Sequence, residues 1–464
     1  MAYRNLDEFL IRLEQAKERI PNTSPIVTNL FNTERRIAWA LNLENLNMLT
    51  QKVHDLISPE MSFSGLMSQA GALMAMFRQF NSPKPAAVQR HNTPANISVL
   101  PQYRRGAHDS HNSLPFAYLI TPTAKRYVHE IIIHNTHTLG IQPIVHLTEK
   151  TPAAVVIGGD PAVMWSVYTP LPQHIDPYWV AGWLRGKPVP QTSALTQPIM
   201  IPADAEMIIE GVIDPTKPLP PAYLQGVDGF YHKITQLLPF HITAITHRNE
   251  AVFPVMSVHD FHWMNQAITR FYLPILKMLF DCIEDIYLPQ CGAGRNLTII
   301  SIHKRTPGDA YRVLHGIWGL GELAYSRAVI IVDNNVNIQD QQEVWHVIQQ
   351  QVDWHKDVTI TNGITHPQDL IYPKGVGAKI GIDATHKVGR TIGMWDNAIR
   401  LTHDPTDQYR FPDDHLIILP PQVDINQPDL VWRYVLATVN WHNDLELDGN
   451  RIIIRAVFDL GRFE

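Results

Sequence analysis

The chain has 464 residues, of which 45% are hydrophobic and 18% charged, and its formal net charge is −6. This balance is that of a globular protein with two or three domains and excludes a disordered chain. No cluster of Lys and Arg is dense enough to hold a phosphate backbone, so we expect no nucleic acid as a partner.

The sequence also indicates a compartment. It has two cysteines, Cys282 and Cys291, without CxxC spacing. We expect reduced thiols, with a disulfide across the short gap as the alternative. The N-terminal ten residues alternate charged with apolar side chains, unlike a signal peptide. No run approaches the ~20 apolar residues of a membrane span, so the sequence predicts a cytoplasmic protein without one.

The first 90 residues are predicted to be helical. Apolar residues recur at helical spacing from Leu6 to Ala16, and Asn22 to Pro25 end or redirect that helix. Further helical tracts run over about 33–56 and 64–80. The Pro-bearing stretch 82–85 is typical of a linker.

From about Ile97 to Arg295 the pattern changes to short apolar runs separated by Pro and Gly, which predicts a β-rich domain. Strands are expected at Tyr127–His134, Ala153–Ile157 and Met207–Ile213. Phe271–Ile283 is apolar at helical spacing and is predicted to link two domains.

The remaining chain alternates strand and helix patterns, which predicts an α/β domain. The strands are expected at 297–302, 328–333 and 357–361, and the helices at 308–324 and 336–351. Gly375–Gly381 is interpreted as a flexible loop. The tail from 430 to 461 carries both helix and strand signals.

Several motifs together resemble the UbiD family of decarboxylases, which use a prenylated flavin. The most specific form one block from residue 157 to 214: Ile157-Gly-Gly-Asp-Pro161, Val180-Ala-Gly-Trp-Leu-Arg-Gly186, Ile201-Pro-Ala-Asp-Ala-Glu206 and Glu210-Gly-Val-Ile-Asp214. Others follow at 241–247, 301–308, 315–322, 333–340 and 379–385. Their order and spacing carry the resemblance.

The resemblance implies α/β and α+β domains. These are a trimmed helical portion (1–90), a central split β-barrel domain like that of flavin reductases (91–290), and a C-terminal α/β oligomerisation domain (291–464). It also implies prenylated FMN (prFMN) and Mn2+ as cofactors and a homo-oligomer, with an active UbiD-type paralogue as a further candidate partner. In the family, a Glu–Arg–Glu/Asp network transfers the proton, and Asn, His and Glu hold the metal.

At the corresponding positions this chain has lost those groups. The two loop acids fall at Pro221 and Gly226, and the metal-ligand Glu falls at Pro177. The family's Asn-x-x-x-x-Arg strand falls on Lys125 to Glu130. The nearest carboxylates that could substitute as catalytic groups are Asp228, Asp176 and Glu130.

Histidines offer an alternative site. On one continuous strand Glu130 and His134 would share a face and, with a third group, could bind a metal ion. The other interpretation of this histidine-rich chain is that these residues lie at the surface or satisfy local backbone groups. Other clustered histidines are His108, His111, His129, His137, His259 and His262. We favour the second interpretation, because no ligand spacing such as HExxH occurs.

The glycines of Gly158-Gly-Asp-Pro161 also have two interpretations. They could cradle a phosphate, but they lack GxGxxG spacing and a Walker lysine. Asp160 and Pro161 are more simply an N-cap and the first residue of a helix.

Two functions remain open. The first is a degenerate UbiD-type protein with a binding or subunit role. The second is an active prFMN-dependent carboxy-lyase on an aromatic or α,β-unsaturated acid that uses displaced residues. A different activity in the old flavin cleft is a weaker third possibility.

Overall fold

The structure is a computed structural model of the chain. It describes residues 3, 5–18, 25–57, 91–93, 95–114, 116–122, 126–128, 130–142, 147–172, 175–226, 228–366, 369–372, 375–387, 399–411, 414–448 and 451–457. The predicted helix at 64–80, the linker at 82–85, Lys125 and His129 therefore lie outside the described residues. The chain divides into two compact units, Met1–Ile268 and Thr269–Glu464, and the three-domain boundaries drawn from the sequence stay a prediction.

Short helices open the first unit. Helix α1 (Leu6–Gln15) begins where the Asn5 side chain accepts a hydrogen bond from the Glu8 amide. The predicted tract at 33–56 proves to be two helices, α2 (Glu34–Ala40) and α3 (Asn47–Ile57). They separate because Asn42 adopts a left-handed conformation (φ 61°), which ends a helix.

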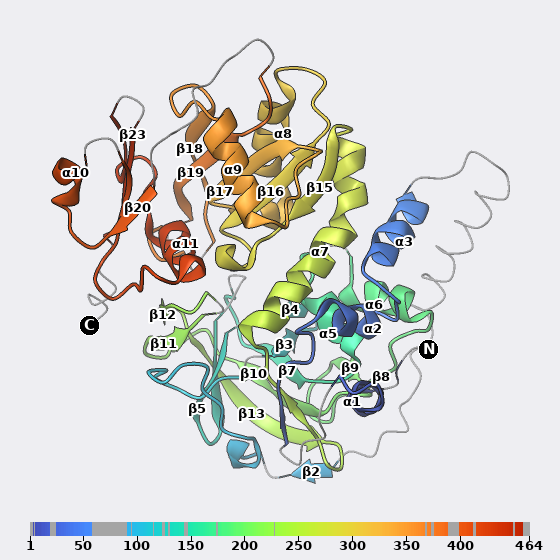
Figure 1. The fold of residues 1–464 in the computed structure, drawn as a ribbon. Coiled ribbons are helices and arrows are strands. Elements are labelled where there is room, and N and C mark those ends of the chain that lie inside the picture. The colour runs from blue at the N-terminus through green and yellow to red at the C-terminus, as the bar shows by residue number, and fades with distance from the viewer. Residues whose placement is uncertain are drawn as a thin grey trace. The chain divides into compact units, whose positions relative to one another are not determined.

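A curled eight-stranded sheet forms the body of the first unit (Figure 1). Its path runs β4-β3-β7-β10-β13-β6-β5, and β2 pairs with β13. The strands are β2 (His91–Thr93), β3 (Ala117–Ile120), β4 (Arg126–Val128), β5 (Ile131–Asn135), β6 (Thr138–Ile141), β7 (Thr151–Ile157), β10 (Met207–Ile213) and β13 (Leu238–His247). This half-barrel confirms the predicted central β-rich architecture.

Central strand β7 is buried on both sides, because successive side chains point to opposite faces. Ala153 and Val155 join the core inside the curl, whereas Ala154 and Val156 pack against two helices. Those helices are α5 (Pro161–Tyr168) and α6 (Pro177–Arg185). Both have Pro at N1, and the predicted Asp160 cap of α5 is confirmed.

The expected single strand Tyr127–His134 is wrong. The chain forms β4 and β5 with Glu130 between them, and a register shift falls between Ile133 and Asn135. This shift interrupts the alternation of side chains. The assumption that Glu130 and His134 share a strand face therefore fails.

Smaller elements surround the half-barrel. One of them is the antiparallel hairpin of β11 (Ala222–Gln225) and β12 (Tyr231–Ile234), in the segment where the sequence predicts the family's loop acids to be missing. The others are β1 (Ile26–Val27) with β14 (Phe253–Pro254), β8 (Gln191–Ser193) with β9 (Met200–Pro202), and the 3-10 turn η1 (Ile97–Val99).

Helix α7 (Val258–Leu279) carries the chain from the first unit into the second; it begins earlier and ends earlier than the linking helix predicted at Phe271–Ile283. A five-stranded sheet follows, in the order β15-β16-β17-β19-β18, with β16, β17 and β19 parallel. Its elements are β15 (Ile283–Tyr287), η2 (Gln290–Gly292), β16 (Leu297–Ile302), α8 (Asp309–Ile317), η3 (Gly321–Tyr325), β17 (Ala328–Asp333), α9 (Gln341–Gln351), β18 (Val358–Ile364) and β19 (Val376–Asp383). The predicted helices at 308–324 and 336–351 are thus shorter than expected.

The interpretation of Gly375–Gly381 as a flexible loop is wrong. Most of it belongs to β19, a central strand whose residues from Gly377 onward are buried. At Gly381 a Cβ atom would lie 2.4 Å from a methyl group of Leu314 in α8. The glycine therefore permits helix α8 to approach the sheet closely. From the sequence alone, the same glycine was interpreted as a sign of flexibility.

The tail forms a second, four-stranded sheet in the order β20-β21-β23-β22. The segment 430–461, whose sequence carries both helix and strand signals, forms one helix and a hairpin in its described part. Its elements are β20 (Ile399–Thr402), α10 (Asp407–Arg410), β21 (His415–Ile418), α11 (Pro428–Thr438), β22 (Leu445–Asp448) and β23 (Arg451–Arg455). The multidomain α/β and α+β class is confirmed.

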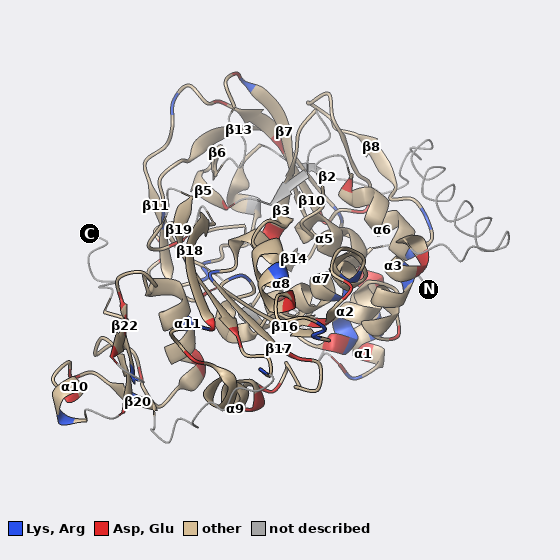
Figure 2. Cartoon of the chain, turned by 90° about the horizontal axis from the view of Figure 1, so that it is seen from above, with Lys and Arg blue, Asp and Glu red and all other residues tan. Residues whose placement is uncertain are grey.

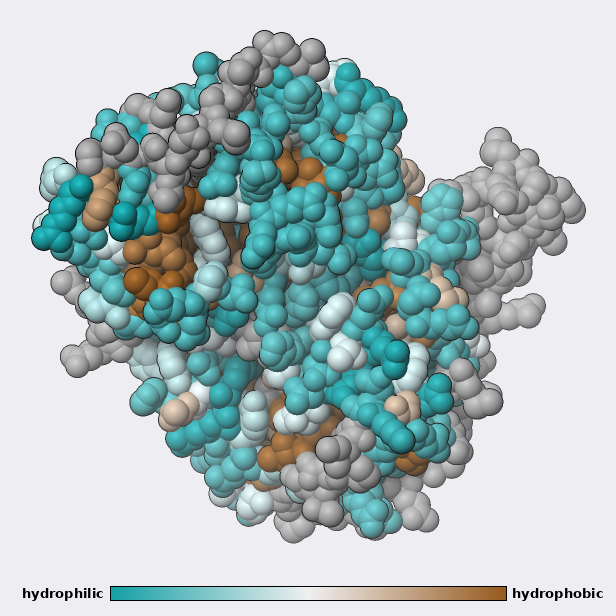
Figure 3. All heavy atoms as spheres, in the orientation of Figure 1, coloured by the Kyte–Doolittle hydropathy of each residue, from teal (hydrophilic) through white to brown (hydrophobic). Residues whose placement is uncertain are grey.

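Charges of both signs are interspersed over the chain (Figure 2). On the face seen in Figure 3, hydrophilic residues cover most of the described surface and the apolar patches are separate. Among the described helices, none is long and apolar enough to cross a bilayer.

Candidate functional site

The family's two loop acids align, by the sequence resemblance, with Pro221 and Gly226, which lie at either end of β11 in the hairpin β11–β12. Pro221 is exposed just before β11, and Gly226 follows β11 directly. Neither residue can gain or lose a proton, so any acid–base chemistry here must come from other side chains.

One carboxylate of this hairpin, Asp228, is buried with 5% of its surface exposed. Its two oxygens lie 2.9 and 2.8 Å from Nε2 of His232, and Oδ1 also accepts a hydrogen bond from the Phe230 amide. The structure thus places the predicted candidate Asp228 in a contact with a histidine four residues along the chain.

The second candidate, Glu130, is paired with Arg105. A carboxylate oxygen of Glu130 lies 3.5 Å from Nη1 of Arg105, which also donates to the Gln225 carbonyl at the end of β11. Asp109 fixes this arrangement, because its carboxylate accepts hydrogen bonds from the amides of Arg105, Gly106 and Gln225 at 2.7–2.9 Å. In the alignment expected from the sequence, Glu130 stands where the family has its Arg, and the structure places a guanidinium, that of Arg105, opposite this carboxylate.

Tyr168, the last residue of α5, belongs to the same electrostatic group. Burial raises the pKa of its hydroxyl, and the Glu130 carboxylate raises it further. Burial is the largest influence on the pKa of Arg105 and would lower it, but Glu130, Tyr103, Tyr168 and Asp109 together outweigh burial, and the net pKa lies above its ordinary value. The site therefore holds an ionised Arg105, with Tyr168 as a neutral hydroxyl at physiological pH.

The third candidate, Asp176, caps helix α6. Its carboxylate accepts a hydrogen bond of 2.8 Å from the Tyr178 amide, and Pro177 follows as the first helical residue. At this end of the helix the acid has the position and contact of an N-cap.

The metal candidate His134 lies on β5, with its ring stacked on that of His111 at 6.1 Å between centroids. Burial, His134 and Arg104 lower the pKa of His111. His137 contacts the Ala95 carbonyl through Nδ1 at 2.8 Å, in line with the local structural interpretation of the histidines. In the part of the chain that the structure describes, no three His, Cys, Asp or Glu residues are grouped to hold a metal ion.

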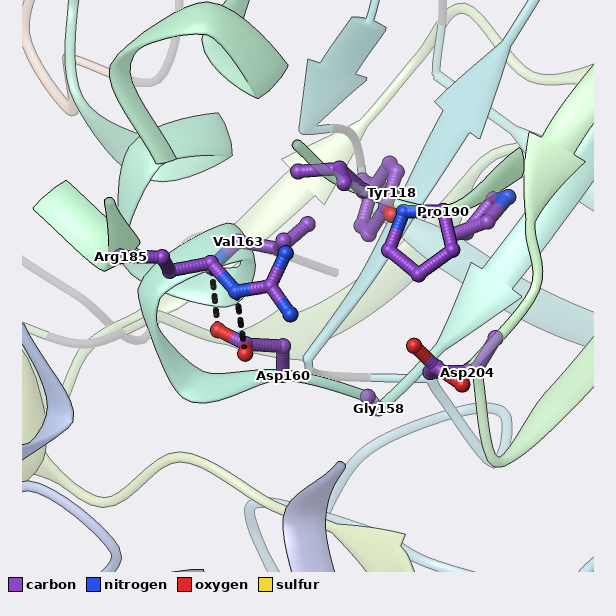
Figure 4. A pocket seen from close by; sticks show the side chains of 11 residues that line it. Tyr118, Gly158, Asp160, Val163, Arg185, Pro190 and Asp204 are labelled. Atoms are coloured by element: carbon purple, nitrogen blue, oxygen red, sulfur yellow. Dashed lines mark hydrogen bonds and ion pairs between the residues drawn. The ribbon is translucent and has the colours of Figure 1, made fainter. Parts of the chain in front are cut away.

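A small pocket lies at the Gly-Gly-Asp-Pro turn (Figure 4). Nε of Arg185 lies 2.7 Å from Oδ2 of Asp160, while Oδ1 caps α5 through the amides of Ala162 and Val163. Burial raises the pKa of Asp160, and Arg185 lowers it. The cavity volume is about 10 Å³, room for one water molecule. The buried ion pair gives this turn a structural role.

In the second unit, ionisable groups gather where the parallel strands end. Nζ of Lys304 donates to Oγ1 of Thr385 at 2.7 Å, and Nζ of Lys387 lies 3.4 Å from the Asp383 carboxylate. Burial lowers the pKa of Lys387, although Asp383 and Asp357 oppose this. These charges are matched within the unit.

Sequence reasoning missed Arg105, Asp109, Tyr168 and His232. Arg105 and Asp109 lie in an irregular segment before β3 with no motif, and the contacts that bring them to the site, with Glu130 and Gln225, are to residues more than twenty positions away. His232 lies four residues from Asp228, so the hairpin turn could have suggested that pair.

Two adjoining family models match this chain. One is described as the Rift-related domain of 3-octaprenyl-4-hydroxybenzoate carboxy-lyase and matches residues 103–260; the other, its C-terminal domain, matches residues 262–384. An uncharacterized protein of Archaeoglobus fulgidus is 29% identical over 391 residues, spanning 78% of this chain and 81% of the relative. Another from Aquifex aeolicus is 28% identical over 396 residues, spanning 78% and 80%.

Solved structures resemble the fold. The UbiD-class enzyme HmfF from Pelotomaculum thermopropionicum, in complex with FMN, superposes with a TM-score of 0.65 at 20% identity, over 83% of this chain and 95% of that one. The closed form of vanillic acid decarboxylase from Sedimentibacter hydroxybenzoicus gives 0.67 at 20% identity, over 89% and 98%. At these identities the likeness establishes the fold alone.

The residues present do not fit the metal that this resemblance implies. A divalent ion that carries a flavin phosphate needs oxygen or imidazole donors. The residue that the resemblance aligns with the Glu ligand is Pro177, the nearby Asp176 carboxylate caps α6, and the described ranges contain no group of three His, Cys, Asp or Glu residues that could replace it.

Proposed function

Since the chain belongs to the UbiD family, we propose that it is a catalytically degenerate member that keeps the scaffold for a binding or subunit role. The observation that carries this proposal is the replacement of ionisable groups at separate positions of the family site. Pro177, Pro221 and Gly226 stand where the family has acids. A shared fold does not by itself confer activity, because function depends on the groups in the site.

The surviving acids support the same proposal. Asp176 is used as a helix cap, Asp228 contacts His232, and Glu130 is neutralised by Arg105. Each carboxylate is thus engaged inside the protein. A proton donor for decarboxylation would need to be released from these contacts first.

A homo-oligomer, an active UbiD-type paralogue as a partner, and a cytoplasmic location belong to this proposal. They follow from the family resemblance and the composition. The C-terminal domain is the part that would mediate assembly.

The second candidate function is a prFMN-dependent carboxy-lyase that acts on an aromatic or α,β-unsaturated acid with displaced residues. It is favoured by one observation: Glu130 and Arg105 lie 3.5 Å apart beside the hairpin, so a carboxylate–guanidinium pair is present in exchanged order. Glu130 would then hold the proton and Arg105 the substrate carboxylate.

The deciding experiment is co-expression with a prenyl-flavin synthase, followed by an absorbance spectrum and metal analysis of the purified protein. The degenerate function predicts a colourless protein without stoichiometric manganese. A UbiD-class enzyme of known activity, produced in parallel, controls for flavin supply. Bound flavin with one manganese per chain would reject the degenerate function and favour the carboxy-lyase.

A further inference from the structure

The hairpin that has lost its family acids carries a different pair of ionisable groups, Asp228 and His232. They lie on either side of the turn, 5% and 6% exposed, with His232 Nε2 at 2.8–2.9 Å from both carboxylate oxygens. The aspartate is also fixed by the Phe230 amide at 3.1 Å. The pair is therefore held by both its own contact and the turn.

Gly226 makes room for this pair. A Cβ atom at residue 226 would lie 2.6 Å from Oδ1 of Asp228 and 2.7 Å from Nε2 of His232. The backbone of Gly226 does not have a positive φ, so space, not conformation, requires the glycine. An acidic side chain at residue 226 could not coexist with the observed contact.

We propose that Asp228 and His232 form an acid–base dyad in which Nδ1 of His232 is the proton-accepting atom. Asp228 is the positioning residue. The site would take a ligand with a weakly acidic O–H or C–H group, and it is independent of whether the protein binds a flavin.

The assignment of Nδ1 follows from the contacts. An ionised Asp228 accepts a hydrogen bond from the Nε2–H group, which leaves Nδ1 of the neutral ring unprotonated. Within the described ranges no hydrogen bond to Nδ1 occurs, and 7% of the His232 side chain is exposed to solvent. A carboxylate that fixes one nitrogen and stabilises the imidazolium is the arrangement in which histidine acts as a base.

The proton balance is simple. Nδ1 takes a proton from the ligand, the electron pair of the broken bond stays on the ligand oxygen or carbon, and Asp228 stabilises the imidazolium. The neighbouring side chains Ala222, Leu224 and Ile234 form an apolar cluster. This apolar surrounding strengthens the electrostatic effect of the carboxylate on the ring.

The test is carbethoxylation with diethyl pyrocarbonate, which modifies unprotonated, accessible imidazole nitrogens. Rates are read for each histidine by peptide mass spectrometry, with the exposed His241 on β13 as the internal standard. Asp228→Asn is expected to slow modification of His232 about ten-fold or more relative to His241, because the Asn amide can donate to Nε2 and leave the ring proton on Nδ1. Gly226→Ala, which displaces the pair without straining the backbone, is expected to change the rate at His232 and not at His241.

Lys233→Ala is the matched control, because Lys233 is an exposed neighbour on the opposite face of β12. It is expected to leave the rate at His232 unchanged, and circular dichroism checks the fold of each variant. If His232 is unmodified in the wild-type protein, or reacts equally in the folded Asp228→Asn variant, the proposal is overturned. Neither of these two results depends on flavin or manganese content. A failure of the dyad proposal can therefore be distinguished from a failure of the proposed degenerate function.

Discussion

The motif block at 157–214 and the hairpin at 221–234 differ in how their ionisable side chains are paired. In the block, buried acids are paired with bases: Asp160 with the buried Arg185 at 2.7 Å, and Glu206 with the half-buried Arg248, which follows β13, at 2.7 Å. In the hairpin segment, Pro221 and Gly226 stand where the family resemblance led us to expect acids, and the carboxylate present, Asp228, is paired with His232. The groups that hold the half-barrel together are therefore separable from those that would act on a ligand.

The largest expected effect is on the stability of the motif block, where Asp160 is paired with Arg185. Asp160→Asn removes the charge opposite the buried Arg185 guanidinium. We expect a loss of about 3–5 kcal/mol in the free energy of unfolding, because a buried charge is left unpaired. Urea denaturation measures it. The double variant Asp160→Asn/Arg185→Met should recover part of the loss, and a loss below about 1 kcal/mol would contradict the structural role.

The pH dependence of stability tests the same block. Burial raises the pKa of Glu206 from its ordinary 4.5 to about 7, although Arg248 lowers it. Because the folded state holds this proton more tightly, the stabilisation is complete below about pH 4.5 and is lost as pH rises through about 7. The change is on the order of 3 kcal/mol. Thermal melts from pH 5 to 8 measure it. The Glu206→Gln variant should have a flatter profile, and an unchanged slope would reject the assignment.

The hairpin side is tested by Asp109→Ala. Asp109 accepts three backbone hydrogen bonds that tie Arg105 and Gly106 to Gln225, and it is 3% exposed. We expect a loss of about 2–3 kcal/mol, since buried amides are left without partners. Asp109→Asn, which keeps one acceptor oxygen, should lose about half as much. Equal stability of both variants and the wild type would show that the segment is not fixed by this side chain.

The smallest expected effect concerns Asp176 and shows whether this residue is a helix cap or a displaced metal ligand. Asp176→Ala should lower the free energy of unfolding by about 1 kcal/mol, because the Tyr178 amide loses its acceptor. Addition of MnCl2 should leave the melting temperature of the wild-type protein unchanged. If manganese raises the melting temperature and Asp176→Ala abolishes this rise, a metal binds at Asp176. An acid of the motif block would then act on a ligand, contrary to the difference drawn between the block and the hairpin.

The features that could be predicted from the sequence are those that depend on neighbouring residues. Strand β10 and the Asp160 cap were correctly predicted, because a short apolar run and a capping dipeptide are local patterns. Strand β19 was misread as a loop, because the close approach of Leu314 to Gly381 joins residues that are far apart in the chain. Among the candidate site residues, Asp228, Asp176 and Glu130 were identified from the sequence, but their contacts were not.

The sequence by itself determined the family resemblance, the alternation of elements and the absence of acids at residues 177, 221 and 226. These are properties of residue type and order. The tertiary structure decided that Glu130 faces Arg105, that Asp109 ties a loop to the hairpin, and that Gly226 leaves space for the Asp228–His232 pair. Such contacts depend on how strands and turns bring side chains together, and a one-residue break such as that at Glu130 changes which groups meet.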